Sequence, residues 1–261
     1  MKFIVTPYHN HLLKDYDRLS AFHEAIISKS RGLVYDIGAG SGILSFFAAP
    51  HSNFIFAFEK NFKSSTCAQK NLEQFPHIQV INTDVLEYKF TEKADLIICE
   101  MLDTALIDEE QVPVLNKALK YLKDNGDIIP CGVINGAELV FMKSPRLSYQ
   151  DVDTPEFLDY QVKGPLIVYN KINFNREINE KVNIDLELTV NIQGMVNAIK
   201  ITTFTLLTPD IICGPTPMLN PPLFIPIGEL YLDEGDEIKI NLSYTMGGGL
   251  DTIRTKIKRF S

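Results

Sequence analysis

The sequence predicts an α/β fold class: a domain built on a parallel sheet, followed by a β-barrel-like domain. Two patterns lead to this prediction. Between residues 32 and 130, short apolar runs alternate with segments of helical periodicity, which is typical of parallel strands connected by helices. After Pro130, polar and apolar residues alternate with a period of two, as in antiparallel strands. The length of 261 residues suits two such domains.

The first domain is expected to span residues 31–130. Its strands are the apolar runs at residues 33–37, 54–58, 78–81, 94–99 and 128–129. Helix-forming segments lie between them at residues 43–49, 62–75 and 109–122. Asn125-Gly126 is interpreted as a turn before the last strand. Residues 1–30 predict a helical lead-in, because apolar residues recur there at helical spacing.

The second domain is expected to span residues 131–261. Residues 183–190 alternate strictly, and further strand-like segments follow at residues 200–207, 224–232 and 236–244. A closed or sandwich-like arrangement is favoured over an open sheet because it protects the strand edges. Residues 144–180 are polar and contain prolines, and we interpret them as an insertion between early strands.

Composition excludes several classes of protein. The formal net charge is -8, which argues against a nucleic-acid partner and leaves room for a cationic substrate. No apolar stretch is long enough to span a membrane, so we expect no membrane partner. The four cysteines form no CxxC pair and the histidines lack ligand spacing, so no metal is predicted. Without a signal peptide, the protein is expected to be cytoplasmic.

The strongest local signal is a glycine-rich turn directly after the first strand, at residues 38–42. Asp36 precedes it, and Gly38 and Gly40 allow the backbone to turn tightly and approach a ligand. The helix that follows offers its N-terminus to the same ligand. The spacing is GxGxG, whereas GxGxxG favours a dinucleotide pyrophosphate. The turn therefore predicts a ligand site of another kind.

The next two strands end in residues that suit a nucleoside. Glu59 closes the second strand, where its carboxylate can accept hydrogen bonds from both hydroxyls of a ribose. Asp84 and Val85 follow the third strand, where an acidic group or a backbone amide can meet an adenine edge. Carboxyl ends of parallel strands share one edge of a sheet, so the sequence predicts a nucleoside site there.

Together these features resemble the class I S-adenosylmethionine-dependent methyltransferases, which have a Rossmann-like domain. Residues 99–109 follow the fourth strand and resemble the double-E loop of the protein arginine N-methyltransferases, with Glu100 and Glu109 at the two glutamate positions. The resemblance implies S-adenosyl-L-methionine as cofactor. It also implies that both glutamates are catalytic and hold the methyl acceptor.

Residues 9–18 resemble the lead-in of the same family, which covers the cofactor. By that resemblance Arg18 pairs with the methionine carboxylate and His9 lines the same end. Asp15 matches a family position near the active site, and equally fits a solvated helix acid. The family's Thr-His-Trp loop is absent, because residues 217–222 read Pro-Met-Leu-Asn-Pro-Pro. The chain also has no Trp and a shorter segment at the family's dimerisation arm, so a homodimer is an expectation from the resemblance alone.

The chemistry of two carboxylates suits a guanidino group. A guanidinium is a permanent cation with a planar fork of donors, which carboxylates match with paired hydrogen bonds. The alternative for this pair is that Glu100 caps a strand and Glu109 lies in the first turn of a helix. We expect an enzyme that N-methylates arginine in a protein, or a small guanidino compound. The alternatives are a small-molecule N- or O-methyltransferase and a catalytically silent scaffold that keeps the nucleoside site.

Overall fold

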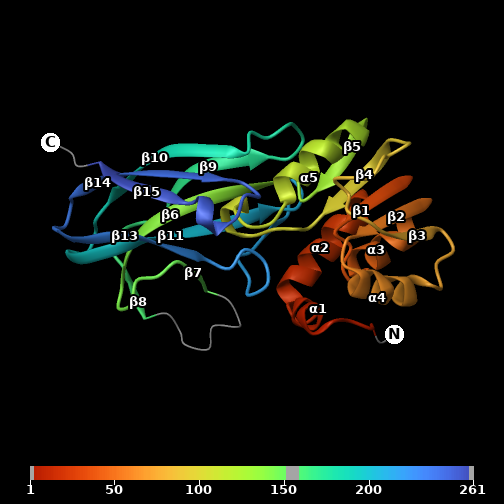
Figure 1. Ribbon diagram of the computed structural model, residues 1–261, viewed down its shortest axis with the longest axis horizontal. Helices are drawn as coiled ribbons and strands as arrows, with labels where there is room; N and C mark the ends of the chain where they lie inside the picture. The colour runs from red at the N-terminus through yellow and green to blue at the C-terminus, as the bar shows by residue number, and fades with distance from the viewer. Residues whose placement is uncertain (1–2, 151–158, 259–261) are drawn as a thin grey trace.

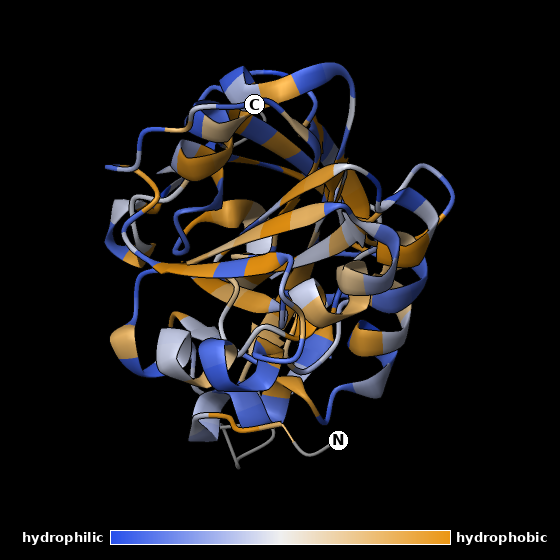
Figure 2. Cartoon of the chain, turned by 90° about the vertical axis from the view of Figure 1, so that its right-hand side faces the viewer, coloured by the Kyte–Doolittle hydropathy of each residue, from blue (hydrophilic) through white to orange (hydrophobic). Residues whose placement is uncertain are grey.

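The computed structural model describes residues 3–150 and 159–258. Two lobes lie along its long axis, a parallel-sheet lobe that contains the N-terminus and an antiparallel lobe that contains the C-terminus (Figure 1). Hydrophobic residues concentrate on the strands in the interior of the molecule, and hydrophilic residues concentrate on the loops around them (Figure 2). Within the described part of the chain, no helix is long and apolar enough to cross a membrane.

The parallel sheet has the strand order β3-β2-β1-β4-β5. Its strands are β1 (Leu33–Ile37), β2 (Phe54–Glu59), β3 (Ile78–Asn82), β4 (Ala94–Cys99) and β5 (Leu122–Ile129). The helices α3 (Ile43–Ala48), α4 (Phe62–Leu72) and α5 (Gln111–Ala118) connect them. The strand order reverses between β1 and β4, and ligands of open α/β sheets bind outside the carboxyl ends of the strands at such a point. The glycine-rich turn follows β1 directly at this edge.

Two predicted boundaries in this lobe were wrong. The last strand begins at Leu122, and Asn125-Gly126 lies inside it, because an irregularity in the β4–β5 register takes up the extra residues. The helix predicted at 109–122 covers only α5, and a 3-10 turn, η3 (Leu119–Tyr121), leads from it into β5.

The lead-in consists of α1 (Pro7–Leu12) and α2 (Tyr16–Lys29). The Asp15 side chain caps α2 by accepting a hydrogen bond from the Arg18 amide at 3.2 Å. Phe22 and Ile26 on α2 are fully buried and pack with Leu44 of α3. This packing fixes the lead-in beside the first strand, and so sets the direction from which Arg18 enters the ligand site.

The antiparallel lobe contains two sheets around one apolar core. The larger sheet has the order β7-β13-β11-β6-β8, with β9 also paired to β6 and β12 to β11; the smaller has the order β10-β14-β15. The strands are β6 (Gly132–Met142), β7 (Ser148–Tyr149), β8 (Tyr160–Val162), β9 (Ile167–Asn173), β10 (Lys181–Thr189), β11 (Gly194–Leu206), β12 (Ile212–Cys213), β13 (Leu223–Leu232), β14 (Glu237–Thr245) and β15 (Arg254–Lys258). The predicted fold class, a parallel-sheet domain followed by an antiparallel one, is therefore confirmed.

The insertion expected at residues 144–180 is largely part of the sheet. Strand β7 pairs with β13, and β8 and β9 pair with β6. These pairings use backbone groups of partners far away in the chain, so the local polar composition did not reveal them. Residues 151–158 of the expected insertion lie outside the described residues.

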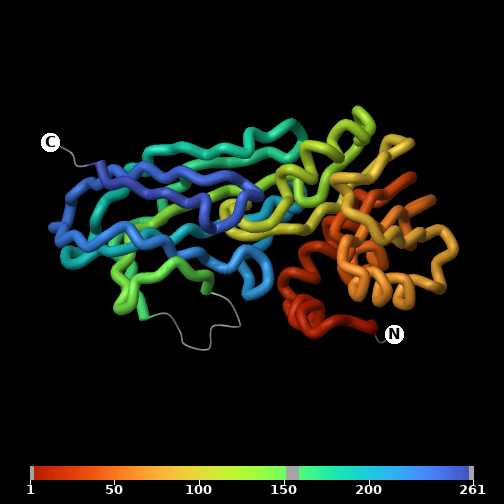
Figure 3. The backbone as a smooth tube through the Cα atoms, viewed as in Figure 1, coloured from red at the N-terminus to blue at the C-terminus, as the bar shows by residue number. Residues whose placement is uncertain are grey.

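The two lobes meet at the segment that follows β4. Figure 3 shows this stretch, drawn in yellow, leaving the parallel sheet and reaching into the antiparallel lobe. It includes a 3-10 turn, η2 (Thr104–Leu106), in which Ala105 and Leu106 have φ angles of 60° and 61°. Left-handed backbone is unfavourable for residues with a Cβ atom, so contacts from the second lobe hold this conformation.

Candidate active site

A cavity of about 530 Å³ opens at the carboxyl edge of the parallel sheet. Its walls come from α1, the glycine-rich turn, the ends of β2 and β3, and the segment after β4. The predicted site residues that line it are His9, Arg18, Gly38, Gly40, Glu59, Asp84, Val85, Glu100 and Glu109. The fold thus brings nine of the ten predicted residues to one cavity, although they come from six separate segments of the chain.

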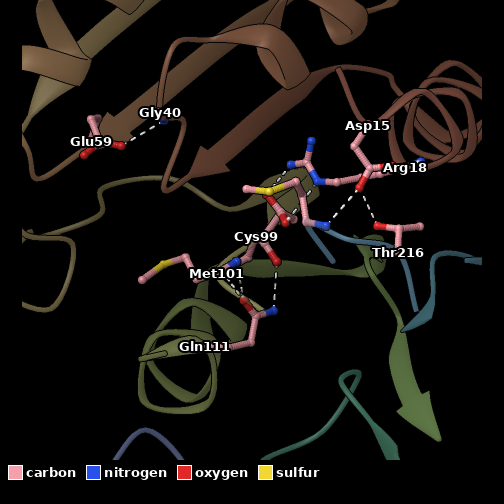
Figure 4. A network of polar contacts seen from close by, with 10 residues as sticks. Asp15, Arg18, Gly40, Glu59, Cys99, Met101, Gln111 and Thr216 are labelled. Atoms are coloured by element: carbon pink, nitrogen blue, oxygen red, sulfur yellow. Dashed lines mark hydrogen bonds and ion pairs between the residues drawn. The ribbon is translucent and has the colours of Figure 1, made fainter. Parts of the chain in front are cut away.

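Glu59 organises the glycine-rich turn. Its Oε2 accepts a hydrogen bond from the Gly40 amide at 2.8 Å, and its Oε1 accepts one from the Asn61 amide at 2.7 Å (Figure 4 shows the contact with Gly40). Each carboxylate oxygen keeps a further lone pair for a ligand hydroxyl. The end of β2 therefore presents a fixed, acceptor-only group to the cavity.

His9 lies directly against this turn. A Cβ atom placed on Gly40, where φ is +56°, would lie 2.5 Å from His9 Nε2. The other ring nitrogen, Nδ1, lies 2.7 Å from Thr6 Oγ1. Burial lowers the pKa of His9, against an opposing effect from the Glu59 carboxylate, so the ring is neutral near pH 7 and can donate or accept a hydrogen bond.

Asp36 is the one predicted residue that does not line the cavity. Its side chain is 1% exposed beneath the glycine-rich turn, and its Oδ2 accepts a hydrogen bond from Ser45 Oγ at 2.5 Å. Oδ1 has no hydrogen-bond partner among the described residues. Burial raises the pKa of Asp36 to about 7, against the opposing hydrogen bonds from Ser45.

Asp84 and Val85 form the wall beyond β3. Asp84 makes an ion pair with Lys60 at 2.7 Å, and it accepts a hydrogen bond from the Leu86 amide at 2.9 Å. The Lys60 hydrogen bond holds the pKa of Asp84 below its usual value. Asp84 is therefore ionised at neutral pH, while Val85 adds an apolar surface beside it.

Arg18 and Glu100 form a buried ion pair in the wall of the cavity. Arg18 Nη2 donates to Glu100 Oε2 at 2.5 Å, and Arg18 Nε donates to Oε1 at 3.3 Å. The two side chains are 2% and 13% exposed. Arg18 Nη1 is buried and has no partner among the described residues. A buried guanidinium nitrogen of this kind needs an acceptor, and the carboxylate of a ligand in the cavity would suit it.

Gln111, which sequence reasoning missed, fixes the backbone on either side of Glu100. Its Oε1 accepts from the Met101 amide at 2.9 Å, and its Nε2 donates to the Cys99 carbonyl at 2.8 Å (Figure 4). Gln111 is fully buried at the start of α5. Glu109 precedes that helix, so its expected alternative position in a first helical turn was wrong. Burial raises the pKa of Glu109, and the neighbouring Asp103 carboxylate raises it further.

Asp15 is a second residue whose role needed the structure. It is 9% exposed, and its Oδ2 accepts hydrogen bonds from Thr216 Oγ1 at 2.5 Å and from the Met218 amide at 3.1 Å (Figure 4). The interpretation of Asp15 as a solvated helix acid was therefore wrong. This contact holds the segment that matches the Thr-His-Trp loop against the lead-in, and Met218 from that segment lines the cavity.

The cavity fits S-adenosylmethionine in its chemistry. The free Nη1 of Arg18 suits the methionine carboxylate, and Gly40 leaves no room for a side chain beside His9. Glu59 offers fixed acceptors for a ribose, as described above. The fold and these residues together define a nucleoside-binding methyltransferase site of class I.

Comparisons with known proteins agree with this class. A family model described as a methyltransferase domain matches residues 34–126. The chain is 50% identical over 257 residues to a protein of Methanothermobacter thermautotrophicus described as uncharacterized, covering 98% of this chain and all of that one. It is 36% identical over 266 residues to another so described from Methanocaldococcus jannaschii, covering 98% and 99%.

Two further comparisons concern arginine methyltransferases. Over 127 residues the chain is 35% identical to the histone-arginine methyltransferase CARMER of Drosophila persimilis, covering 46% of this chain and 24% of that protein. The solved PRMT1 enzyme-prozyme complex of Trypanosoma brucei with AdoHcy has a chain of the same fold, with a TM-score of 0.81 and 16% identity over 98% of this chain and 94% of that one. The chain belongs to the class I S-adenosylmethionine-dependent methyltransferases. It resembles the arginine methyltransferases among them, and S-adenosylmethionine is its cofactor.

Proposed function

We propose that this protein transfers the methyl group of S-adenosylmethionine to a nitrogen of a guanidino group. One observation carries the proposal: Glu100 and Glu109 line the same cavity as the residues expected to hold the cofactor. The Glu100 side chain is 13% exposed, and this low exposure strengthens its attraction for a cation. Glu109 is an exposed residue, and partial desolvation still raises the pKa of its carboxylate. A guanidinium between them is fixed in its plane, because each carboxylate accepts a pair of its N–H groups.

The two glutamates have different tasks in this proposal. Glu100 is already held by Arg18, so its position is set before the acceptor arrives. Glu109 has a raised pKa, which makes it the better acceptor for the proton that the attacking nitrogen loses. The bound cofactor supplies an electrophilic methyl group on a sulfonium. Most of the acceleration comes from orientation and electrostatics.

The remaining predicted residues are proposed to hold the cofactor. His9 and Arg18 contact its methionine end, with Gly38 and Gly40 allowing its close approach. Glu59 binds the ribose, and Asp84 and Val85 contact the adenine. Asp36 lies outside the cavity lining, so we propose that it acts indirectly, by stabilising the glycine-rich turn that contacts the cofactor.

Methylation of a small molecule at nitrogen or oxygen is the second candidate. The observation in its favour is Met218, which lines the cavity from the segment that matches the family's Thr-His-Trp loop. The Met218 thioether is a soft, apolar surface that can contact methyl acceptors of varied shape. The His and Trp of the family's loop would instead supply directed hydrogen-bond donors.

A methyl-transfer assay with labelled S-adenosylmethionine tests these candidates. Arginine-rich peptides, free guanidino compounds, and primary amines and alcohols of similar size form three parallel arms. Labelled peptide or guanidino product supports the proposal, while label only in the third arm supports the second candidate. Weak cofactor binding by calorimetry, together with no transfer to any acceptor, supports the scaffold alternative.

We also propose that the protein works in the cytoplasm as a homodimer. All four cysteines are free thiols in the structure, which suits a reducing compartment. Fractionation of the host cell and light scattering of the purified chain test the two statements separately.

A further inference from the structure

Asp103 accepts hydrogen bonds from the backbone of the loop that carries Glu109. Its Oδ2 accepts from the Ile107 and Asp108 amides, both at 3.0 Å, and its Oδ1 accepts from the Glu109 amide at 3.1 Å. The Tyr149 hydroxyl of the antiparallel lobe donates to Oδ2 at 2.9 Å. Asp103 is only 7% exposed. Four donors on one buried carboxylate are enough to fix both the carboxylate and the three backbone amides.

The second lobe also holds the strained part of this loop. The Gly247 amide donates to the Leu106 carbonyl and the Gly249 amide donates to the Ile107 carbonyl, both at 2.9 Å. The Ala105 amide donates to Thr203 Oγ1 at 2.8 Å. The left-handed angles of Ala105 and Leu106 are therefore maintained from outside the loop, and backbone of this kind persists only where the surroundings determine it.

We propose that Asp103 is a positioning residue of the acceptor site: with Tyr149 it fixes the direction in which Glu109 meets the acceptor. The inference rests on the proposed function for the acceptor's identity, while the positioning itself concerns the loop alone. In this arrangement the antiparallel lobe contributes to the chemistry by holding the second glutamate in place.

Ionisation of Asp103 is the basis of the positioning. The titratable groups that face it are Tyr149 and Tyr244 from the antiparallel lobe, and Asp108 and Glu109 from its own loop. Burial raises the pKa of Asp103 to about 6, and the hydrogen bonds from the loop amides and Tyr149 oppose that effect. A proton on either oxygen replaces an acceptor with a donor, so the loop loses one of its contacts below about pH 6.

Asp103→Asn tests the positioning, because asparagine has the same shape but offers one accepting oxygen. We expect kcat/KM to fall by about thirtyfold near pH 8, with S-adenosylmethionine binding unchanged. The ratio of wild-type to variant kcat/KM should approach one as the pH is lowered toward 5, because the wild type then loses the same acceptor. A ratio that stays constant with pH overturns the proposal.

Tyr149→Phe is the milder variant in case Asp103→Asn folds poorly. Loss of its hydroxyl removes a hydrogen bond that stabilises the ionised Asp103, so the acid limb of kcat/KM should move to higher pH. The matched control is Tyr231→Phe, on an exposed tyrosine of the antiparallel lobe. This control should keep the wild-type profile, and a Tyr149→Phe profile that coincides with it overturns the proposal.

Hydrogen exchange gives a readout that does not depend on activity. Protection of the Ile107, Asp108 and Glu109 amides should decrease in Asp103→Asn, and in the wild type as the pH falls through about 6. If the wild type methylates no acceptor but this protection behaves as stated, only the proposed function fails. Unchanged protection at all three amides contradicts the positioning role itself.

Discussion

Arg18 and Glu100 are 82 residues apart in the chain and meet as a buried, two-point ion pair in the wall of the cavity. Arg18 comes from the lead-in helix α2, and Glu100 follows strand β4. The Nη1 nitrogen of Arg18, in the same wall, has no hydrogen-bond partner in the described part of the chain. Because one side chain thus reaches both the first glutamate and the expected place of the cofactor carboxylate, we propose that Arg18 couples the two proposed sites.

Arg18→Lys should separate these contacts. Lysine keeps the charge but cannot bind two groups with a planar fork. We expect cofactor affinity to fall by about tenfold or more, because a charge-assisted hydrogen bond is worth about 1.5–3 kcal/mol. Calorimetry with S-adenosylmethionine measures this. Arg31→Lys is the control, since Arg31 pairs with Asp127 at the surface and should leave affinity unchanged; equal affinity in both variants would contradict the assignment of Arg18.

Glu100→Gln and Glu109→Gln should differ in stability while both lose activity. Glu100→Gln leaves the buried Arg18 charge without its ion pair, which costs about 3 kcal/mol and lowers the melting temperature. Glu109→Gln removes a carboxylate whose pKa burial has raised, so the melting temperature near pH 8 should hold or rise. We expect kcat/KM of each to fall on the order of a hundredfold. Full turnover in Glu109→Gln would exclude its role in holding the acceptor.

Gly40→Ala should weaken cofactor binding for a steric reason. A Cβ atom at Gly40 would lie 2.5 Å from His9 Nε2, so His9 and the turn must shift apart. Gly228→Ala is the matched control, because its φ of +91° is also left-handed but nothing lies within 4 Å of the added atom. Both variants should lose about 1 kcal/mol of stability from the backbone. Only Gly40→Ala should bind S-adenosylmethionine more weakly. Equal affinities of the two variants would rule out a close approach of the cofactor to the backbone at Gly40.

Asp36 should make the free energy of unfolding depend on pH. Its pKa of about 7 in the folded protein exceeds the value of about 4 expected for an unfolded chain. The folded state therefore keeps a proton that the unfolded state has lost, and this contribution to stability disappears as the pH rises from about 4 to about 7. Asp36→Asn carries no charge, so it should be more stable than the wild type near pH 8 by roughly 1–4 kcal/mol.

Denaturant unfolding of the cofactor-free protein at several pH values measures this difference. It should shrink as the pH falls toward about 4. Asp84→Asn serves as the control of opposite sign, because Lys60 lowers the pKa of Asp84. That variant should be slightly less stable than the wild type near pH 8, by under about 1 kcal/mol for a partly exposed pair. A pH-independent difference for Asp36→Asn would contradict the raised pKa.

The strands β1 to β4 and the glycine-rich turn were predictable because their signals are local. A buried parallel strand is a short apolar run, and a tight turn after it needs glycine. Strand β5 was predicted too short, because its irregular pairing with β4 depends on a neighbour and not on its own residues. The paired strands β8 and β9 were missed for the same reason.

In the candidate site, the residue types came from the sequence and their partners came from the structure. The spacing of Glu100 and Glu109 is visible in the chain, and so are the acids that end β2 and follow β3. Asp103 and Gln111 carry no such signal, since an isolated acid or amide in a loop is ordinary. Their roles follow from hydrogen bonds to backbone groups that only the folded chain brings within reach.

The sequence by itself determined the class of domain and the order of its elements, and it predicted the residues proposed for the cofactor, because hydrophobic periodicity and glycine turns act over a few neighbouring residues. Only the tertiary structure decided how the proposed acceptor site is held. Arg18 reaches Glu100 from the lead-in, Asp15 fixes the segment at Met218, and Tyr149 holds Asp103 from the second lobe. These contacts join residues far apart in the chain, and their strength depends on burial, which no local pattern specifies.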